Sequence, residues 1–316
     1  MSRISHYWLH LCAIMTTKQE PPRPATPPPT IKTYTFPPSN PQLAPLTVSL
    51  IGSHHSLWGH ILFESSLVMS NHLFHNQSRL VSGKNVVEFG AGAGVPGLAA
   101  GVLGARKVVL TDYPSVELLK NLEENVKENS EVHEGLDERV VVEGHVWGRD
   151  CAPVLKYLQV EEKSELDTAT STTTSSSTIP DPNPSQPSSS SLAPNTLPDT
   201  SKFQTLLLSD LIFNHSQHLA LLRSLERLID PACGTALVFH SHHLPQHRAR
   251  DLKFFEMAEK RGWTVEKVVE EVRGVQFVDD GGDVGLRERV WGREMRWDGI
   301  VREEESDSES EAEDKK

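Results

Sequence analysis

The sequence predicts an α/β protein whose central sheet is mostly parallel and has an antiparallel strand at its edge. Three observations carry this prediction. Short apolar runs alternate with amphipathic segments, a glycine-rich turn follows one of the first runs, and two strand-like segments close the pattern without a helix between them. Alternating strands and helices build parallel sheets, whereas two consecutive strands pair antiparallel.

The individual elements follow from hydrophobic periodicity. Residues 85–89 and 107–111 are short apolar runs, as expected of strands buried on both faces. A helix is expected over residues 116–128, where Leu118 and Leu122 lie on one apolar face. By the same criteria, further helices are expected over 60–73, 96–103, 153–158, 216–229 and 248–260, and further strands over 46–51, 139–146, 203–209, 235–240, 263–272 and 289–297.

Composition divides the chain into one folded domain, residues 46–301, and three segments expected to be disordered. Residues 1–45 form a leader that ends in a proline-rich arm. Residues 161–200 are rich in Ser, Thr, Pro and Asp, so this insertion cannot bury enough apolar surface to offset its ordering entropy. Residues 302–316 form an acidic tail whose like charges repel one another.

Charge and composition exclude several classes of function. The net charge of −12 comes mostly from the insertion and the tail, at −5 each, so the folded part is nearly neutral. Such a domain lacks the broad basic face of a nucleic-acid-binding protein. The apolar runs fall short of the ~20 residues that span a membrane, and the histidines and three cysteines lack metal-binding spacing. We therefore expect a cytoplasmic monomer without a metal, membrane or nucleic-acid partner.

A glycine-rich turn marks the expected ligand site. Residues 86–97 read V-V-E-F-G-A-G-A-G-V-P-G, an apolar strand that runs into alternating glycines and opens a helix. Such a turn suits a nucleotide-like cofactor, because glycine allows positive φ and the helix start offers free N–H groups. Gly92, Gly94 and Gly97, followed by Asp112, formally satisfy a dinucleotide fingerprint, which leaves a nicotinamide enzyme open.

A second register of the same turn favours a different cofactor. Glu88 ends the strand and Gly90, Ala91 and Gly92 follow it, which resembles motif I of S-adenosylmethionine-dependent methyltransferases. A carboxylate there suits a cofactor that carries a sulfonium and an ammonium, whereas it would lie poorly beside a pyrophosphate. Asp112 ends the next strand and is expected at the carboxyl edge of the sheet, where open α/β sheets bind ligands.

Five short stretches together identify a family resemblance. They read L-W-G-H at 57–60, V-V-E-F-G-A-G-A-G-V-P at 86–96, T-D-Y-P at 111–114, V-W-G-R-D at 146–150 and S-D-L-I-F-N-H at 209–215. Over about residues 37–297 the chain resembles the elongation factor methyltransferase 7 family, also described as nicotinamide N-methyltransferase-like, within the family 16 methyltransferases. The resemblance implies the Rossmann-like sheet of class I methyltransferases and S-adenosylmethionine as the cofactor.

The resemblance also implies a set of cofactor contacts. Together with Glu88 from the glycine register, these residues are Trp58, Gly90, Ala91, Gly92, Asp112, Trp147 and Ser209. The two tryptophans can wall the adenine or the methyl donor, and Asp112 can accept hydrogen bonds from two ribose hydroxyls. Packing in the core is the alternative role for both tryptophans.

Asp210 is the main catalytic candidate. It follows Ser209 at the end of a buried apolar strand, so both belong at the ligand edge of the sheet. Because only a neutral amine can attack a sulfonium methyl, the site must position and desolvate the acceptor. We expect Asp210 to receive the incoming ammonium and the Asn214 amide oxygen to help orient it. His215 is a candidate base or a helix cap.

One departure from the larger family bears on this candidate. The family 16 pattern is Asp-x-x-Tyr at this position, whereas the chain reads Asp210-Leu-Ile-Phe213, so the tyrosine hydroxyl is missing. The elongation factor branch tolerates this phenylalanine and adds Asn214. The residues that act on the acceptor are therefore expected to be Asp210 and Asn214.

The resemblance implies a specific acceptor, the amino terminus of translation elongation factor 1-alpha, methylated on its N-terminal glycine and the adjacent lysine. An α-amine is an easier acceptor than lysine, because its pKa is about 7.7–8.0 rather than about 10.4. Two alternatives stay open, a small pyridine such as nicotinamide and a methyltransferase-like binding module without catalysis. The intact Glu88, Asp112 and Asp210 weigh against the binding module.

Overall fold

The computed structural model describes residues 30–40, 42–52, 58–159, 199–277 and 281–301. The predicted tail and most of the predicted leader and insertion therefore lie outside the described residues. None of the helices in the described ranges is long and apolar enough to cross a membrane.

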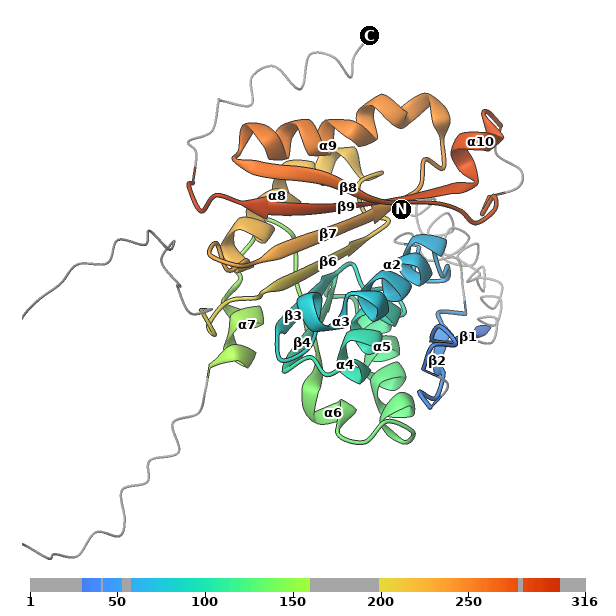
Figure 1. The fold of residues 1–316 in the computed structure, drawn as a ribbon, viewed down its shortest axis with the longest axis vertical. Coiled ribbons are helices and arrows are strands. Elements are labelled where there is room, and N and C mark those ends of the chain that lie inside the picture. Colours follow the sequence, from blue (N-terminus) through green and yellow to red (C-terminus); the bar gives the residue numbers. More distant parts are fainter. Residues whose placement is uncertain (1–29, 41, 53–57, 160–198, 278–280, 302–316) are drawn as a thin grey trace, which may run out of the picture.

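The predicted fold class is confirmed by a seven-stranded, mostly parallel sheet of order β5-β4-β3-β6-β7-β9-β8 (Figure 1). The strands are β3 Asn85–Phe89, β4 Lys107–Asp112, β5 Val140–Gly144, β6 Thr205–Ser209, β7 Thr235–His240, β8 Trp263–Val272 and β9 Arg289–Trp297. Strands β5, β4, β3, β6 and β7 pair in parallel, and β9 is antiparallel to both β7 and β8. The last strand of the chain thus lies one place in from the edge, between β7 and the edge strand β8.

Helices cover both faces of this sheet (Figure 1). The longer ones are α2 Glu64–His75, α4 Val95–Val102, α5 Val116–Ser130, α8 His218–Leu228 and α9 Arg248–Lys260. Short helical segments are α3 Gln77–Leu80, α6 Leu136–Arg139, α7 Ala152–Leu155, α10 Val284–Arg287, η1 Lys156–Leu158, η2 His215–Gln217 and η3 Pro245–His247.

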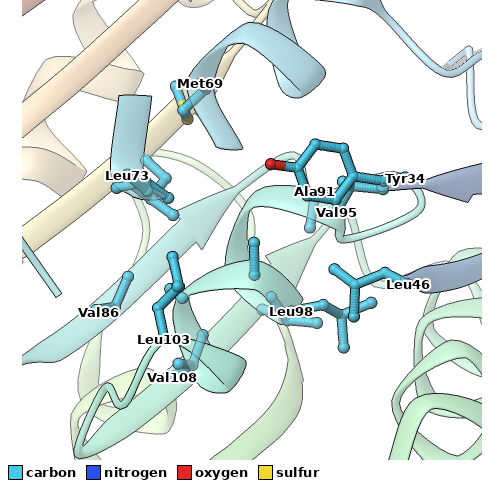
Figure 2. Close-up of a cluster of buried hydrophobic side chains, with 14 of the residues drawn as sticks. Tyr34, Leu46, Met69, Leu73, Val86, Ala91, Val95, Leu98, Leu103 and Val108 are labelled. Carbon is cyan, nitrogen blue, oxygen red and sulfur yellow. The ribbon is translucent and has the colours of Figure 1, made fainter. Parts of the chain in front are cut away.

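The alternating side chains of the strands divide the core into two clusters. Val86 of β3 packs with apolar residues of α2 and α4, whereas its neighbour Val87 packs with residues of α8 and α9. Figure 2 shows the first cluster, where Leu73 of α2 and Leu98 of α4 lie near Val86 and Val108. Successive strand residues point to opposite faces, and helices bury both faces of the sheet. Ligands are therefore expected at the carboxyl ends of the strands.

Part of the predicted disordered leader is folded, which corrects its boundary at residue 45. Residues Thr30–Tyr34 form strand β1, which pairs antiparallel with β2, Leu46–Leu50. Tyr34 and Phe36 are buried in the first core cluster, and this apolar burial stabilises the segment. The many prolines around it made the segment look disordered in the sequence. The strand expected over 46–51 is present as β2, in a separate two-stranded sheet.

Asparagine side chains of α5 hold β2 in place. Asn129 accepts a hydrogen bond from the Thr47 N–H at 3.0 Å and donates to the Thr47 carbonyl at 2.7 Å. Asn125 does the same with Ser49 at 2.8 and 3.1 Å, and it also donates to the Ala93 carbonyl in the glycine turn at 3.1 Å. An amide side chain carries the same donor and acceptor as a peptide group, so α5 ties β2 to the turn.

Candidate active site

A cavity of about 600 Å³ lies at the carboxyl ends of the parallel strands. Its lining includes all ten residues expected to contact the cofactor or the acceptor, namely Trp58, Glu88, Gly90, Ala91, Gly92, Asp112, Trp147, Ser209, Asp210 and Asn214. All of them except Trp58, which precedes α2, come together because each strand of a parallel sheet delivers its terminal residues to the same edge.

The glycine turn between β3 and α4 forms part of this cavity. Gly90, Gly92 and Gly94 have φ of +54°, +57° and +78°, a region that other residues rarely adopt. A Cβ at Gly90 would lie 2.6 Å from a methyl of Leu211, whereas a Cβ at Gly92 would meet nothing within 4 Å. Gly90 therefore allows close packing, and Gly92 leaves space in which a ligand can approach the backbone.

Glu88 lies beneath the turn, at the end of β3. Its Oε2 accepts a hydrogen bond from the N–H of Gly97, the third residue of α4, at 2.8 Å. Burial, with a smaller contribution from the charge of Asp112, raises the pKa of Glu88 to about 8. Glu88 thus satisfies a free N–H at the start of α4, and a cation bound beside it would favour its ionised form.

The raised pKa of Glu88 predicts a pH-dependent stability. Between the ordinary value of 4.5 and about 8, the native protein holds a proton that the unfolded chain has released. The free energy of unfolding should therefore fall as pH rises through this window, by up to about 1.4 kcal/mol per pH unit. Glu88→Gln keeps an oxygen for the Gly97 N–H but cannot ionise, so this contribution should be absent. Urea denaturation of both proteins from pH 4 to 9 measures the difference, and parallel curves would contradict it.

Asp112 is held rigidly at the end of β4. Its Oδ2 accepts a hydrogen bond from the Gly92 N–H at 2.8 Å, and its Oδ1 accepts one from the Tyr113 N–H at 2.7 Å. A carboxylate has about four acceptor positions, so each oxygen can still accept a ligand hydroxyl. These two bonds fix the orientation of Asp112 against the glycine turn.

The two tryptophans differ in their surroundings. Trp147 is half-buried and packs against the second core cluster, so it combines core packing with a place on the cavity wall. Trp58 is 43% exposed, has φ of +61°, and lies edge-on to Phe277 with ring centroids 5.8 Å apart. For Trp58 this exposure excludes the alternative of a core residue.

Asp210 is buried directly after β6, in a left-handed backbone conformation with φ of +52°. Its Oδ2 accepts a hydrogen bond from Ser65 at 2.7 Å, and its Oδ1 accepts one from His243 Nε2 at 2.9 Å. Burial opposes the ionisation of Asp210. The charge of His243 and the hydrogen bonds from His243 and Ser65 outweigh this effect and lower the pKa of Asp210 overall. The cavity therefore contains a fixed, ionised carboxylate. A strained conformation at such a position is typical of functional sites.

Two hydroxyls and an amide complete this end of the cavity. The Ser209 and Ser65 hydroxyls are 2.8 Å apart, so Ser65 joins both predicted residues of the strand end. Asn214 follows on the same loop, where its side-chain oxygen accepts a hydrogen bond from Ser216 at 3.2 Å. His215 instead bonds Asp251 Oδ1 at 2.7 Å and lines a second, smaller cavity.

Comparison with known proteins decides the family. The family model for lysine methyltransferases matches residues 47–161. The protein N-terminal and lysine N-methyltransferase EFM7 of Cryptococcus neoformans is 34% identical and aligns over 86% of this chain and 84% of its own. Relatives of the same name in Schizosaccharomyces pombe and Eremothecium gossypii are 32% and 34% identical, over 86% and 77% of this chain and 91% and 77% of theirs. The chain belongs to the EFM7 family.

Membership of the EFM7 family confirms the predicted family, enzyme class and cofactor. The chain is an N-methyltransferase that methylates protein and takes its methyl group from S-adenosylmethionine. The geometry fits this donor, because the open space at Gly92 and the oriented carboxylate of Asp112 lie on one cavity wall. Of the two glycine registers, the one that begins at Glu88 is the one the family supports.

Sequence reasoning missed two residues of this EFM7 site. Ser65 lies on α2, 145 positions before Asp210, and nothing in its local sequence distinguishes it from a packed serine. His243 belongs to a histidine-rich stretch after β7 that lacks metal-binding spacing. A polar stretch directly after a buried parallel strand was the signal that could have placed His243 at the ligand edge.

Proposed function

We propose that this enzyme methylates the N-terminal glycine and the adjacent lysine of translation elongation factor 1-alpha in the cytoplasm. The observation that carries the proposal is the ionised, buried carboxylate of Asp210 in the cofactor cavity, which suits an incoming ammonium. The names of the relatives describe action on a protein N-terminus and on lysine, and the elongation factor follows from the family resemblance.

Each cavity residue then has a proposed role. The cofactor contacts are Trp58, Glu88, Gly90, Ala91, Gly92, Asp112, Trp147 and Ser209, and the residues that act on the acceptor are Asp210 and Asn214. Asp112 binds the ribose hydroxyls, and the glycine turn lets the cofactor approach the backbone. Asp210 holds the acceptor ammonium through charge, while His243 and Ser65 keep the carboxylate in one orientation.

The chemistry that remains for the protein is positioning and deprotonation. The cofactor supplies a sulfonium methyl, to which the acceptor nitrogen bonds as the carbon–sulfur bond breaks and its electron pair returns to sulfur. The acceptor must lose a proton first, and an α-amine does so near neutral pH. Lysine needs more help: its proton passes to water as burial in the site disfavours the charged form, and the site then fixes the neutral nitrogen in line with the methyl group.

Transfer of a radiolabelled methyl group tests the proposal. The full chain is incubated with labelled S-adenosylmethionine and either recombinant elongation factor 1-alpha or nicotinamide. We expect label on the elongation factor, and less label when its N-terminus has been acetylated beforehand. Label on nicotinamide alone would replace the proposed acceptor with a small pyridine, and no label on either substrate would contradict the proposal.

A further inference from the structure

A second cavity of about 140 Å³ adjoins the cofactor cavity. Four aromatic side chains line it: Trp58, Phe63, Phe213 and Phe277. All of them except Phe277 also line the large cavity, so the two cavities share a wall of three rings. Whatever occupies the small cavity lies beside a molecule in the large one.

The rings of the small cavity meet at steep angles. Phe277 lies edge-on to Trp58 at 69° and to Phe63 at 61°, with centroids 5.8 and 6.4 Å apart. The His243 imidazole meets the Phe277 ring at 86°, with centroids 5.0 Å apart. Side chains at such angles line different sides of one space, which is the arrangement of an aromatic cage.

Two buried carboxylates bond histidines in or beside the small cavity: Asp251 lines this cavity itself, whereas Asp210 lines the large one. Asp210 Oδ1 accepts a hydrogen bond from His243, and Asp251 accepts hydrogen bonds from His215 at 2.7 Å and His242 at 2.6 Å. Burial opposes their ionisation, but these histidines outweigh it and lower the pKa of both acids. Both carboxylates are thus engaged by imidazoles, while aromatic rings form much of the wall of the small cavity. That combination favours a cation whose nitrogen is covered by methyl groups over one that needs strong hydrogen-bond acceptors.

We infer that the small cavity binds the methylated ammonium of the acceptor peptide, the product of methylation at one of its two amines, while the neighbouring amine faces the methyl donor. The inference rests on the proposed function, in which two amines of adjacent residues are both acceptors. Adjacent Cα atoms are about 3.8 Å apart and lysine carries its amine on a four-carbon stem, so the two nitrogens can reach adjoining cavities. The first methylation would then help to present the second amine.

Peptide binding measures this preference. Two synthetic peptides with the N-terminal sequence of elongation factor 1-alpha, one with a free and one with a trimethylated N-terminus, are titrated calorimetrically into the full chain with S-adenosylhomocysteine present. We expect the trimethylated peptide to bind roughly five- to thirtyfold more tightly, the range for cation–π contacts. Tetramethylammonium chloride should compete with it more strongly than sodium chloride at equal ionic strength. Equal affinities for the two peptides would overturn the inference.

Substitution of Phe277 tests the cage itself. Phe277→Leu keeps an apolar side chain but removes the ring, so the preference for the trimethylated peptide should fall to less than about twofold. Phe74→Leu is the matched control, because Phe74 is a half-buried ring that packs on Phe36 and lines neither cavity. Should Phe277→Leu fold poorly, Phe213→Leu, at a more exposed ring, makes the same test. A preference that survives loss of the ring would overturn the inference.

The two proposals fail in different ways. If the unmodified enzyme labels neither the elongation factor nor its N-terminal peptide, the proposed function fails. If it labels them but binds free and trimethylated peptides equally, the acceptor stands and only the role of the small cavity is wrong.

Discussion

Replacing Asp210 by asparagine is expected to lower kcat for protein methylation by roughly 100-fold or more, the range for loss of one preorganised electrostatic group in an active site. Asparagine has the same shape and tolerates the left-handed backbone at this position, where φ is +52°. It cannot carry the charge that attracts an ammonium, and it leaves His243 without its anionic partner. The effect should therefore appear in turnover, with S-adenosylhomocysteine affinity changed by less than about threefold.

A control variant separates this effect from loss of a buried charge in general. Glu226 is another buried carboxylate, and it accepts two hydrogen bonds from Arg261, both at 2.7 Å, outside the cavity. Glu226→Gln should lower the free energy of unfolding while kcat stays close to that of the unmodified enzyme. Methyl transfer is measured with labelled cofactor under saturation. An Asp210→Asn enzyme that keeps kcat within about threefold would remove Asp210 from the mechanism.

The elements that could be predicted are those whose pattern is purely local. Strand β3 has the predicted bounds because an apolar run ends at a glycine turn, and α9 has the predicted bounds of residues 248–260. The helix expected from residue 60 begins only at Glu64, because Ile61, Leu62 and Phe63 extend the apolar pattern but line the cavity instead. Apolar periodicity alone does not distinguish a helix start from a ligand wall.

Pairings between strands that are distant in the sequence could not be predicted from it. The position of β9 between β7 and β8 depends on which strand edge is free after the parallel sheet has formed, and no residue of β9 encodes that choice by itself. Strand β1 was not predicted because it lies within the proline-rich arm, and its partner β2 follows a further proline-containing stretch. In both cases the information lies in tertiary contacts, which outweigh local propensity.

The candidate site could be predicted where residues follow parallel strands, since topology alone brings strand ends together. Gly97 shows the limit of this reasoning, because it fits the spacing of a dinucleotide fingerprint, whose third glycine allows a helix to pack closely on the sheet. In the structure a Cβ on Gly97 would lie 2.2 Å from Leu110 and 2.7 Å from Glu88 Oε2, so its lack of a side chain serves packing of α4 on the sheet. Such packing is needed whichever cofactor binds, so the spacing of Gly97 does not distinguish a dinucleotide from S-adenosylmethionine.

Loss of the Asp112 carboxylate is expected to weaken S-adenosylhomocysteine binding by roughly 10- to 100-fold, the range for one or two hydrogen bonds to a charged group. Asp112→Ala removes both the proposed ribose acceptor and the bond that holds the Gly92 N–H at 2.8 Å, whereas Asp112→Asn keeps one oxygen for that N–H. Alanine should therefore cost more affinity than asparagine, and the difference reports how much the turn itself depends on Asp112. Calorimetric titration measures both, with Asp137→Ala, at an exposed acid of α6, as the control. If both Asp112 variants bound as tightly as the unmodified enzyme, the carboxylate would orient the glycine turn without contacting the cofactor.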